Sequence, residues 1–170
     1  DVTVININED YGGVPDTGQT TSYTSTNGED NDYTIKAPTY TNNGDNTVTD
    51  SITGLIWQKE DDNNTYDWSS ANSYCTNLTL ASESDWRLPA LLELIYIVDY
   101  GEYNPSINSV FSGTNNAQYW TSHVVNEVIA VVNFGNGQAP NNSNNQGTGY
   151  ARCVRAVSYT HLTLPTTPYV

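Results

Sequence analysis

The 170-residue sequence is poor in the side chains that most often carry out catalysis. It has only two histidines, His123 and His161, and two cysteines. It contains no Gly-x-Ser-x-Gly or His-Glu-x-x-His motif, no glycine-rich phosphate loop and no cysteine–histidine zinc spacing. A lone histidine beside Tyr119 and Trp120 is more typical of a surface or packing residue than of a general base. We therefore expect no catalytic residues and no enzymatic activity.

Positive charge and long apolar runs are also scarce. Five Lys and Arg stand against 19 Asp and Glu, which gives a net charge of −14. Such a surface repels phosphate backbones, so nucleic acid is not an expected partner. No apolar run approaches the roughly 20 residues of a membrane-spanning helix, so we expect no membrane insertion. Asn, Thr, Ser, Gly and Tyr provide most of the polar surface, a composition typical of extracellular β-rich proteins.

The two cysteines, Cys75 and Cys153, are 78 positions apart. They form either one disulfide or two buried free thiols. The secreted character of the composition favours the disulfide. On the loop-entropy model a bond closing this loop stabilises the fold by roughly 4–5 kcal/mol.

The stretch from Tyr74 to Asp99 predicts the centre of the fold. It contains Asp85-Trp86-Arg87-Leu88-Pro89 and then the most apolar run of the chain. Pro89 suits the first turn of a helix, and a helix that is apolar all round is a buried one, so we predict a buried helix over 89–99. A second helix over 68–78, capped by Asp67, places Cys75 on its buried face. The two helices bracket a short strand at 86–88.

The remaining patterns predict β structure. The runs Thr47–Asp50 and Leu55–Gln58 read as a β-hairpin, preceded by the turn residues Asn43-Gly44 and Asp45-Asn46. Trp57 is a core candidate. Later strands are predicted at 119–122, 128–134 and 150–155.

Three motifs in order resemble the Lcl C-terminal domain family, whose biochemical function is unknown and whose members often end secreted bacterial proteins. They are Asp85-Trp86-Arg87-Leu88-Pro89 with its helix, the segment from Tyr40 to Trp57, and the series Tyr-Trp-Thr-Ser, Val-Asn-Phe-Gly-Asn-Gly and Arg-Cys-Val-Arg. The resemblance covers about 14–156, although Ser22 replaces a cysteine that many relatives carry. It implies an α+β, C-type-lectin-like fold with two helices packed on a twisted, mostly antiparallel sheet. The formylglycine-generating enzymes are similar, but their redox cysteine pair has no counterpart here.

Calcium is the expected metal if one binds, because hard cations take carboxylate and amide oxygens. One candidate set is Asn43, Asp45 and Asp50. The other comes from the acidic segment and comprises Glu60, Asp61, Asp62 and Asp67. Neither set follows an EF-hand spacing, and turn capping or a solvated acidic face explains the same residues.

The late loops are the expected ligand-facing surface, as the resemblance to C-type-lectin-like folds implies. The candidate residues there are Asn115, Tyr119, Trp120, His123, Asn136, Asn141 and Asn144. Three Asn-x-Ser/Thr sequons, at Asn63, Asn77 and Asn141, are candidate glycosylation sites. The expected partner is a glycan or another cell-surface ligand.

Two function classes remain open. The first is a non-enzymatic, secreted or cell-surface binding and adhesion module. The alternative is a subunit of an extracellular fibre that joins neighbouring copies of itself through an N-terminal strand within residues 1–13, where Val2, Val4, Ile5 and Ile7 are β-prone. Residues 157–170 resemble the translation of a sequencing adapter and are excluded from functional argument.

Overall fold

The computed structural model describes residues 21–25, 38–142 and 147–156. The predicted N-terminal strand and the tail at 157–170 lie outside these ranges, so the fibre alternative stays a prediction. In chain order the elements are β1 (Tyr40–Asn42), β2 (Thr47–Asp50), β3 (Leu55–Gln58), α1 (Trp68–Asn77), α2 (Leu91–Tyr96), β4 (Gln118–Val125), β5 (Val128–Asn133), β6 (Asn141–Asn142) and β7 (Val154–Ala156). The class is therefore α+β, with two helices and antiparallel sheets, as predicted.

The first sheet has the order β1-β2-β3-β7, and every pairing in it is antiparallel. The β2–β3 hairpin is confirmed, with Val48 opposite Trp57. The predicted strand at 86–88 is reduced to a single bridge between Arg87 and Val154, and the predicted strand at 150–155 begins only at Val154. The last strand thus returns to pair with the third.

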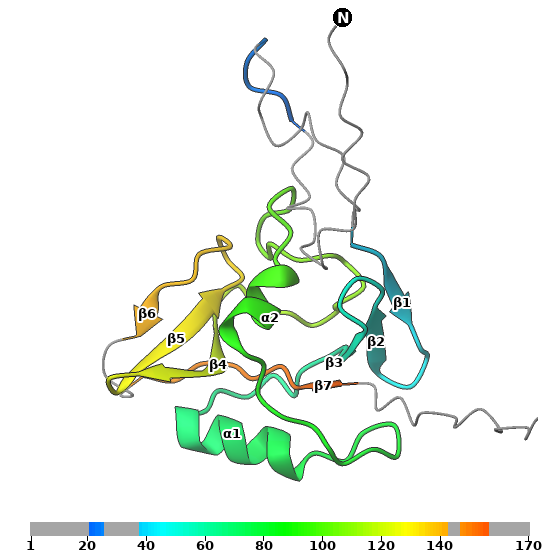
Figure 1. Ribbon diagram of the computed structural model, residues 1–170, viewed down its shortest axis with the longest axis vertical. Coiled ribbons are helices and arrows are strands. Elements are labelled where there is room, and N and C mark those ends of the chain that lie inside the picture. The colour runs from blue at the N-terminus through cyan, green and yellow to red at the C-terminus, as the bar shows by residue number, and fades with distance from the viewer. Residues whose placement is uncertain (1–20, 26–37, 143–146, 157–170) are drawn as a thin grey trace, which may run out of the picture.

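The second sheet has the order β4-β5-β6. The register of β4 on β5 shifts between Trp120 and Val124, where the strand is bulged. The other edge of β4 is partly covered, because the Trp120 N–H donates to Tyr150 O and the Ser122 N–H donates to Pro89 O. In Figure 1 the two sheets lie on either side of α2, and α1 lies below them in the view.

Helix α1 forms as predicted. Asp67 is its N-cap and accepts a hydrogen bond from the Ser70 N–H at 2.7 Å, while Ala71 and Cys75 face the interior. The cap leaves one fewer unpaired N–H group in the first turn. Cys75 and Cys153 form the disulfide, so α1 is tied to the residue that precedes β7.

Helix α2 is shorter than predicted and is not buried all round. It begins two residues after Pro89 and ends at Tyr96, and Leu92 is 60 % exposed. Ile97 and Val98 are buried, but they follow the helix, and Val98 forms a β-bridge with Ile107. The continuous apolar run therefore spans a helix and an extended segment, and its composition alone does not separate them.

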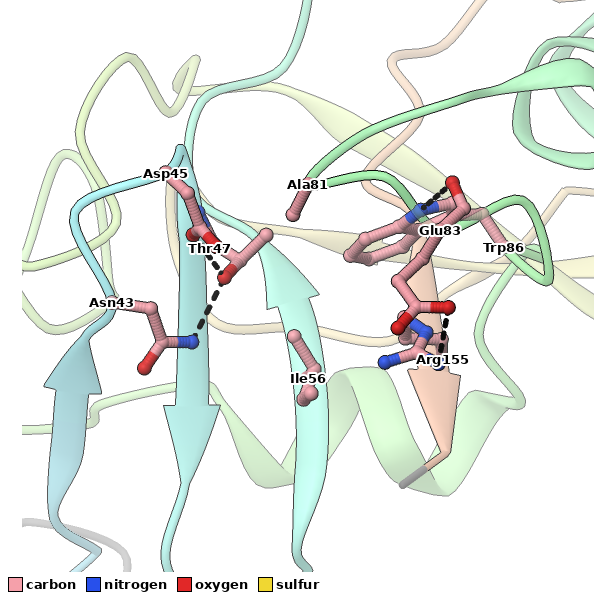
Figure 2. Close-up of a pocket in the computed structure, with 8 residues that line it drawn as sticks. All are labelled: Asn43, Asp45, Thr47, Ile56, Ala81, Glu83, Trp86 and Arg155. Carbon is pink, nitrogen blue, oxygen red and sulfur yellow. Dashed lines mark hydrogen bonds and ion pairs between the residues drawn. The ribbon is translucent and has the colours of Figure 1, made fainter. Parts of the chain in front are cut away.

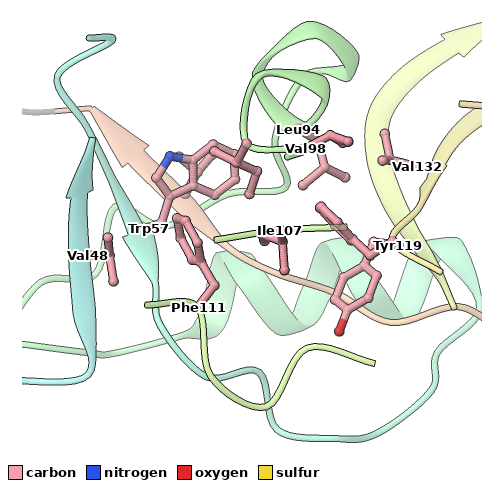
Figure 3. Packing of buried hydrophobic residues seen from close by; sticks show 11 residues of the cluster. Val48, Trp57, Leu94, Val98, Ile107, Phe111, Tyr119 and Val132 are labelled. Atoms are coloured by element: carbon pink, nitrogen blue, oxygen red, sulfur yellow. The ribbon is translucent and has the colours of Figure 1, made fainter. Parts of the chain in front are cut away.

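Two hydrophobic clusters make the core. Figure 3 shows the first, which joins residues of both sheets and of α2 and includes Val48, Trp57, Leu94, Tyr119 and Val132. The second lies against α1 and includes Cys75, Trp86, Trp120, Val131 and Cys153. Neighbouring residues of β4 and β5 belong to different clusters, so this pair of strands is buried on both faces.

Candidate functional site

The predicted ligand surface is wrong at its two aromatic residues. Tyr119 and Trp120 are fully buried. Successive side chains of a strand point to opposite faces, and here both faces of β4 are covered, one by each hydrophobic cluster. The Trp120 indole N–H donates to Tyr66 O at 2.8 Å, which ties β4 to the loop before α1. Both side chains are therefore part of the hydrophobic core and do not lie on an exposed surface.

A buried ionic cluster lies beneath that predicted surface. The Tyr119 hydroxyl donates to Asp61 Oδ2 at 2.5 Å, and Arg152 Nη2 lies 3.6 Å from the same oxygen. The Arg152 and Asp61 side chains are 0 % and 1 % exposed. Burial raises the pKa of the Tyr119 hydroxyl above its ordinary value, which favours the protonated form that donates to Asp61.

Arg152 is the central member of the cluster. It donates to Gln58 O at 2.8 Å, to Lys59 O and to Thr114 Oγ1 at 2.7 Å. Its guanidinium lies 5.5 Å from the centre of the Phe111 ring. Arg152 therefore joins the end of β3, the acidic segment and the loop after Phe111. No sequence pattern predicted this role for Arg152. The available signal is an arginine beside Cys153, a residue expected to be buried, in a chain with only five basic residues.

The other predicted ligand-facing residues do not form one site. Asn115 Nδ2 donates to Asn63 Oδ1 at 2.9 Å, and Asn136 is exposed with its amide bonded to Gln138. His123 is exposed on β4. The Asn141 side chain and Asn144 lie outside the described part of the chain. Of the candidate glycosylation sites, Asn63 and Asn77 are exposed, and glycosylation stays a prediction.

The first candidate calcium set is divided by β2. Asp45 precedes this strand and accepts from the N–H and hydroxyl of Thr47 at 3.1 and 2.6 Å. Asp50 ends the strand and accepts from Ile52 N at 2.9 Å and from Thr53 Oγ1 at 2.6 Å. Asn43 donates to Thr47 Oγ1 at 2.8 Å. Each side chain stabilises its own turn, and the two carboxylates lie at opposite ends of the strand.

The second candidate set also diverges. Asp61 points inward to Arg152, whereas Asp62 accepts from Asn64 and from the Tyr66 hydroxyl. Glu60 accepts from Ser112 Oγ at 2.7 Å, and Asp67 caps α1. Within the described ranges, no three His, Cys, Asp or Glu side chains are grouped so that they could hold a metal ion.

The remaining ion pairs are structural. Arg87 forms a bidentate pair with Glu93 at 2.8 and 2.7 Å, and Glu93 also accepts from the Ala90 N–H. Burial raises the pKa of the Glu93 carboxyl, but these hydrogen bonds outweigh it and the net pKa is lowered. Hydrogen bonds from Arg155 lower the pKa of Asp85. These shifts stabilise the charged forms and do not prepare a group for proton transfer at neutral pH.

A pocket of about 150 Å³ lies at one end of the first sheet. The β1–β2 turn forms one side, and the loop from Ala81 to Trp86 forms the other, with the end of β7 beside it (Figure 2). The lining residues are Asn43, Asp45, Thr47, Ile56, Ala81, Glu83, Trp86 and Arg155. Two predicted calcium ligands, Asn43 and Asp45, thus line a pocket whose opposite side comes from residues remote in sequence. We take this pocket as the candidate functional site.

The family profile of the Lcl C-terminal domain matches residues 46–155, so the chain belongs to the Lcl C-terminal domain family. A search of curated proteins gives no match. Among the residues that the structure describes, no helix has the length and apolar character needed to cross a membrane.

Proposed function

We propose that this protein is a non-enzymatic, extracellular binding or adhesion module with a C-type-lectin-like fold. The observation that carries the proposal is the pocket between the β1–β2 turn and the 81–86 loop. Its wall combines carboxylates, an amide, a hydroxyl, a guanidinium and apolar side chains. Such a mixture suits recognition of a polar surface ligand, because it offers hydrogen-bond donors, acceptors and an apolar contact in one concave site.

The use of the reactive side chains supports a non-catalytic role. Cys75 and Cys153 are bonded to each other and fully buried, so they do not form an exposed redox pair like that of the formylglycine-generating enzymes. Arg87, Arg152 and Arg155 are each paired with carboxylates of the same chain. Arg87 and Arg152 therefore contribute to the fold, whereas Arg155 is both paired and part of the pocket wall.

The extracellular location and the finer fold are part of the same proposal. A disulfide, a strongly acidic chain and membership of the Lcl C-terminal domain family support a secreted or cell-surface protein. Two helices with antiparallel sheets, and a last strand that returns to the early ones, support the C-type-lectin-like assignment. The expected ligand is a glycan of a cell surface or matrix.

A glycan array tests the proposal directly. The disulfide-intact protein is applied in calcium and, separately, in EDTA, with urea-unfolded protein as the matched control. We expect saturable binding to a defined group of glycans that the unfolded protein does not show. Absence of binding to every glycan in both buffers would contradict the proposal. Binding that requires calcium would assign the metal a role in recognition.

A further inference from the structure

We propose that the pocket holds one terminal sugar ring of an uncharged glycan, and that it does so through protein side chains without a bridging metal ion. This inference rests on the proposed function and specifies the place and the ligand class. It moves recognition away from the late loops, where Tyr119 and Trp120 are buried, to the end of the first sheet.

The size of the pocket sets the size of the ligand. Its volume of about 150 Å³ is well below the roughly 300–1,000 Å³ of sites for drug-sized molecules. It therefore admits one ring at the end of a chain and not several rings. Ile56 and Ala81 lie between the polar groups of the two sides (Figure 2) and provide an apolar contact for the C–H face of a sugar.

The hydrogen-bonding groups of the wall match hydroxyl groups. Asp45 uses Oδ1 within its turn, and Glu83 uses Oε2 to pair with Arg155 Nη2 at 3.1 Å. Within the described part of the chain, the second oxygen of each carboxylate has no hydrogen-bond partner. Arg155 bonds Asp85 through Nε and Nη2, which leaves Nη1 without a described partner. A sugar hydroxyl can donate to a carboxylate and accept from a guanidinium at the same time.

The charge and burial of the wall residues favour an uncharged ligand. Arg155 is only 8 % exposed, so its guanidinium is held in place by Asp85 and Glu83 before any ligand arrives. Together with Asp45 these carboxylates outnumber the one guanidinium, so a sulfated or carboxylated sugar would be repelled. A cationic amine would satisfy the carboxylates but would leave the Arg155 N–H groups unpaired and face their charge. A neutral ring satisfies both.

The two sides of the pocket are fixed by the fold. The Asn43 N–H donates to Thr47 O at 3.1 Å and the Lys59 N–H donates to Asn46 O at 2.9 Å, which hold the β1–β2 turn. On the other side the buried Trp86 indole N–H donates to Leu80 O and to Glu83 O at 3.3 and 3.2 Å. A site that is already ordered loses little conformational entropy on binding.

An NMR titration of the full protein tests this inference. Glucose, galactose, mannose, fucose and N-acetylglucosamine are added one at a time in EDTA while the backbone amides, the Arg155 Nε–H and the tryptophan indole N–H signals are followed. We expect at least one sugar to shift, saturably, the signals of residues 43–47, 81–86 and 155. The variants Asp45→Asn and Glu83→Gln keep side-chain shape, and each should weaken that binding by about fivefold or more.

The control variant is Glu127→Gln, which removes an exposed charge at the β4–β5 turn, beside the late loops, and should leave binding unchanged. Dispersed spectra of each variant verify folding. If an array glycan binds the wild type but binds Asp45→Asn and Glu83→Gln equally well, the pocket assignment is wrong while the proposed function stands. Saturable shifts confined to residues 115–124 and 136, or shifts that require calcium, would also overturn it. A protein that binds no sugar in either assay would refute both.

Discussion

Replacing Asp61 by Asn should destabilise the protein far more than its place in an acidic surface segment suggests. The side chain is buried against Arg152 at 3.6 Å and accepts from the Tyr119 hydroxyl. Asn keeps the shape and one acceptor oxygen but removes the charge. The Arg152 guanidinium is then buried without a counter-charge, and the Tyr119 hydroxyl keeps at best a neutral acceptor in place of a carboxylate.

The size of the effect follows from the geometry. Two unit charges 3.6 Å apart attract by about 4–5 kcal/mol at an effective dielectric constant of 20. Removing one partner of a buried pair typically costs about 3–5 kcal/mol. Arg152 keeps its bonds to two backbone carbonyls and to Thr114, which solvate part of its charge. We therefore expect a loss near the lower limit, about 3 kcal/mol.

Urea unfolding at neutral pH, with the disulfide intact and the denaturant slope compared between variants, measures this loss. The matched control is Glu93→Gln, which breaks a bidentate pair with Arg87 whose side chains are 22 % and 42 % exposed and should cost about 1 kcal/mol or less. If Asp61→Asn costs no more than the control, the buried charge is not compensated by Asp61 and the reasoning is wrong. Replacing both Asp61 and Arg152 by apolar residues should recover part of the loss.

Three other predictions concern stability. Replacing Cys75 and Cys153 by Ser should lower the free energy of unfolding by about 4–5 kcal/mol, because the bond closes a loop of 78 positions; a loss below about 1 kcal/mol in urea unfolding would contradict this. Leu94→Ala should cost about 2–5 kcal/mol in the same assay, while Leu92→Ala, at an exposed position of the same helix, should cost little; equal losses would refute the assigned orientation of α2. The pKa of Glu93 is lowered from its ordinary value of 4.5, so its contribution is complete above about pH 4.5 and is lost as the pH falls through the lower folded-state pKa. Glu93→Gln should therefore flatten the acid side of a plot of stability against pH, and an unchanged curve would count against the ion pair.

The sequence alone predicts the β2–β3 hairpin and α1 correctly, because their signals lie in short stretches of the chain. The β2–β3 hairpin has alternating runs with a short connection, and α1 has both a capping residue and a regular apolar spacing. The buried position of Cys75 followed from that spacing. In these cases the hydrogen bonds join residues that are close in sequence, so the pattern contains the information.

The errors have a physical cause in tertiary packing. The burial of Tyr119 and Trp120 depends on α1 and α2 covering opposite faces of β4, which no feature of the Tyr-Trp-Thr-Ser run reveals. The helix over 89–99 was predicted too long because apolar residues continue past its end into a segment that pairs with Ile107. The apolar composition predicts the burial of Ile97 and Val98 correctly, but it does not predict that they lie outside the helix.

The pocket could not be predicted from the sequence, because it too depends on tertiary packing. Asp45, Glu83 and Arg155 meet only because β7 joins the sheet beside β3 and the 81–86 loop covers its end. The sequence predicts Asp45 either as a turn-capping residue or as one of three candidate calcium ligands. Arg155, from the last strand, lies in the same pocket wall, and its positive charge makes a metal ion a less suitable ligand than an uncharged sugar.

The position of the last strand also determines when the domain can fold during synthesis. Arg152, Cys153 and Arg155 bind residues 94, 78 and 70 positions earlier in the chain. During synthesis the helices and the hairpin therefore leave the ribosome well before the segment that joins them. Contacts of such long range form slowly. A chain cut before Arg152 would lack Cys153 and Val154, one member of each core cluster, and would leave both clusters incomplete.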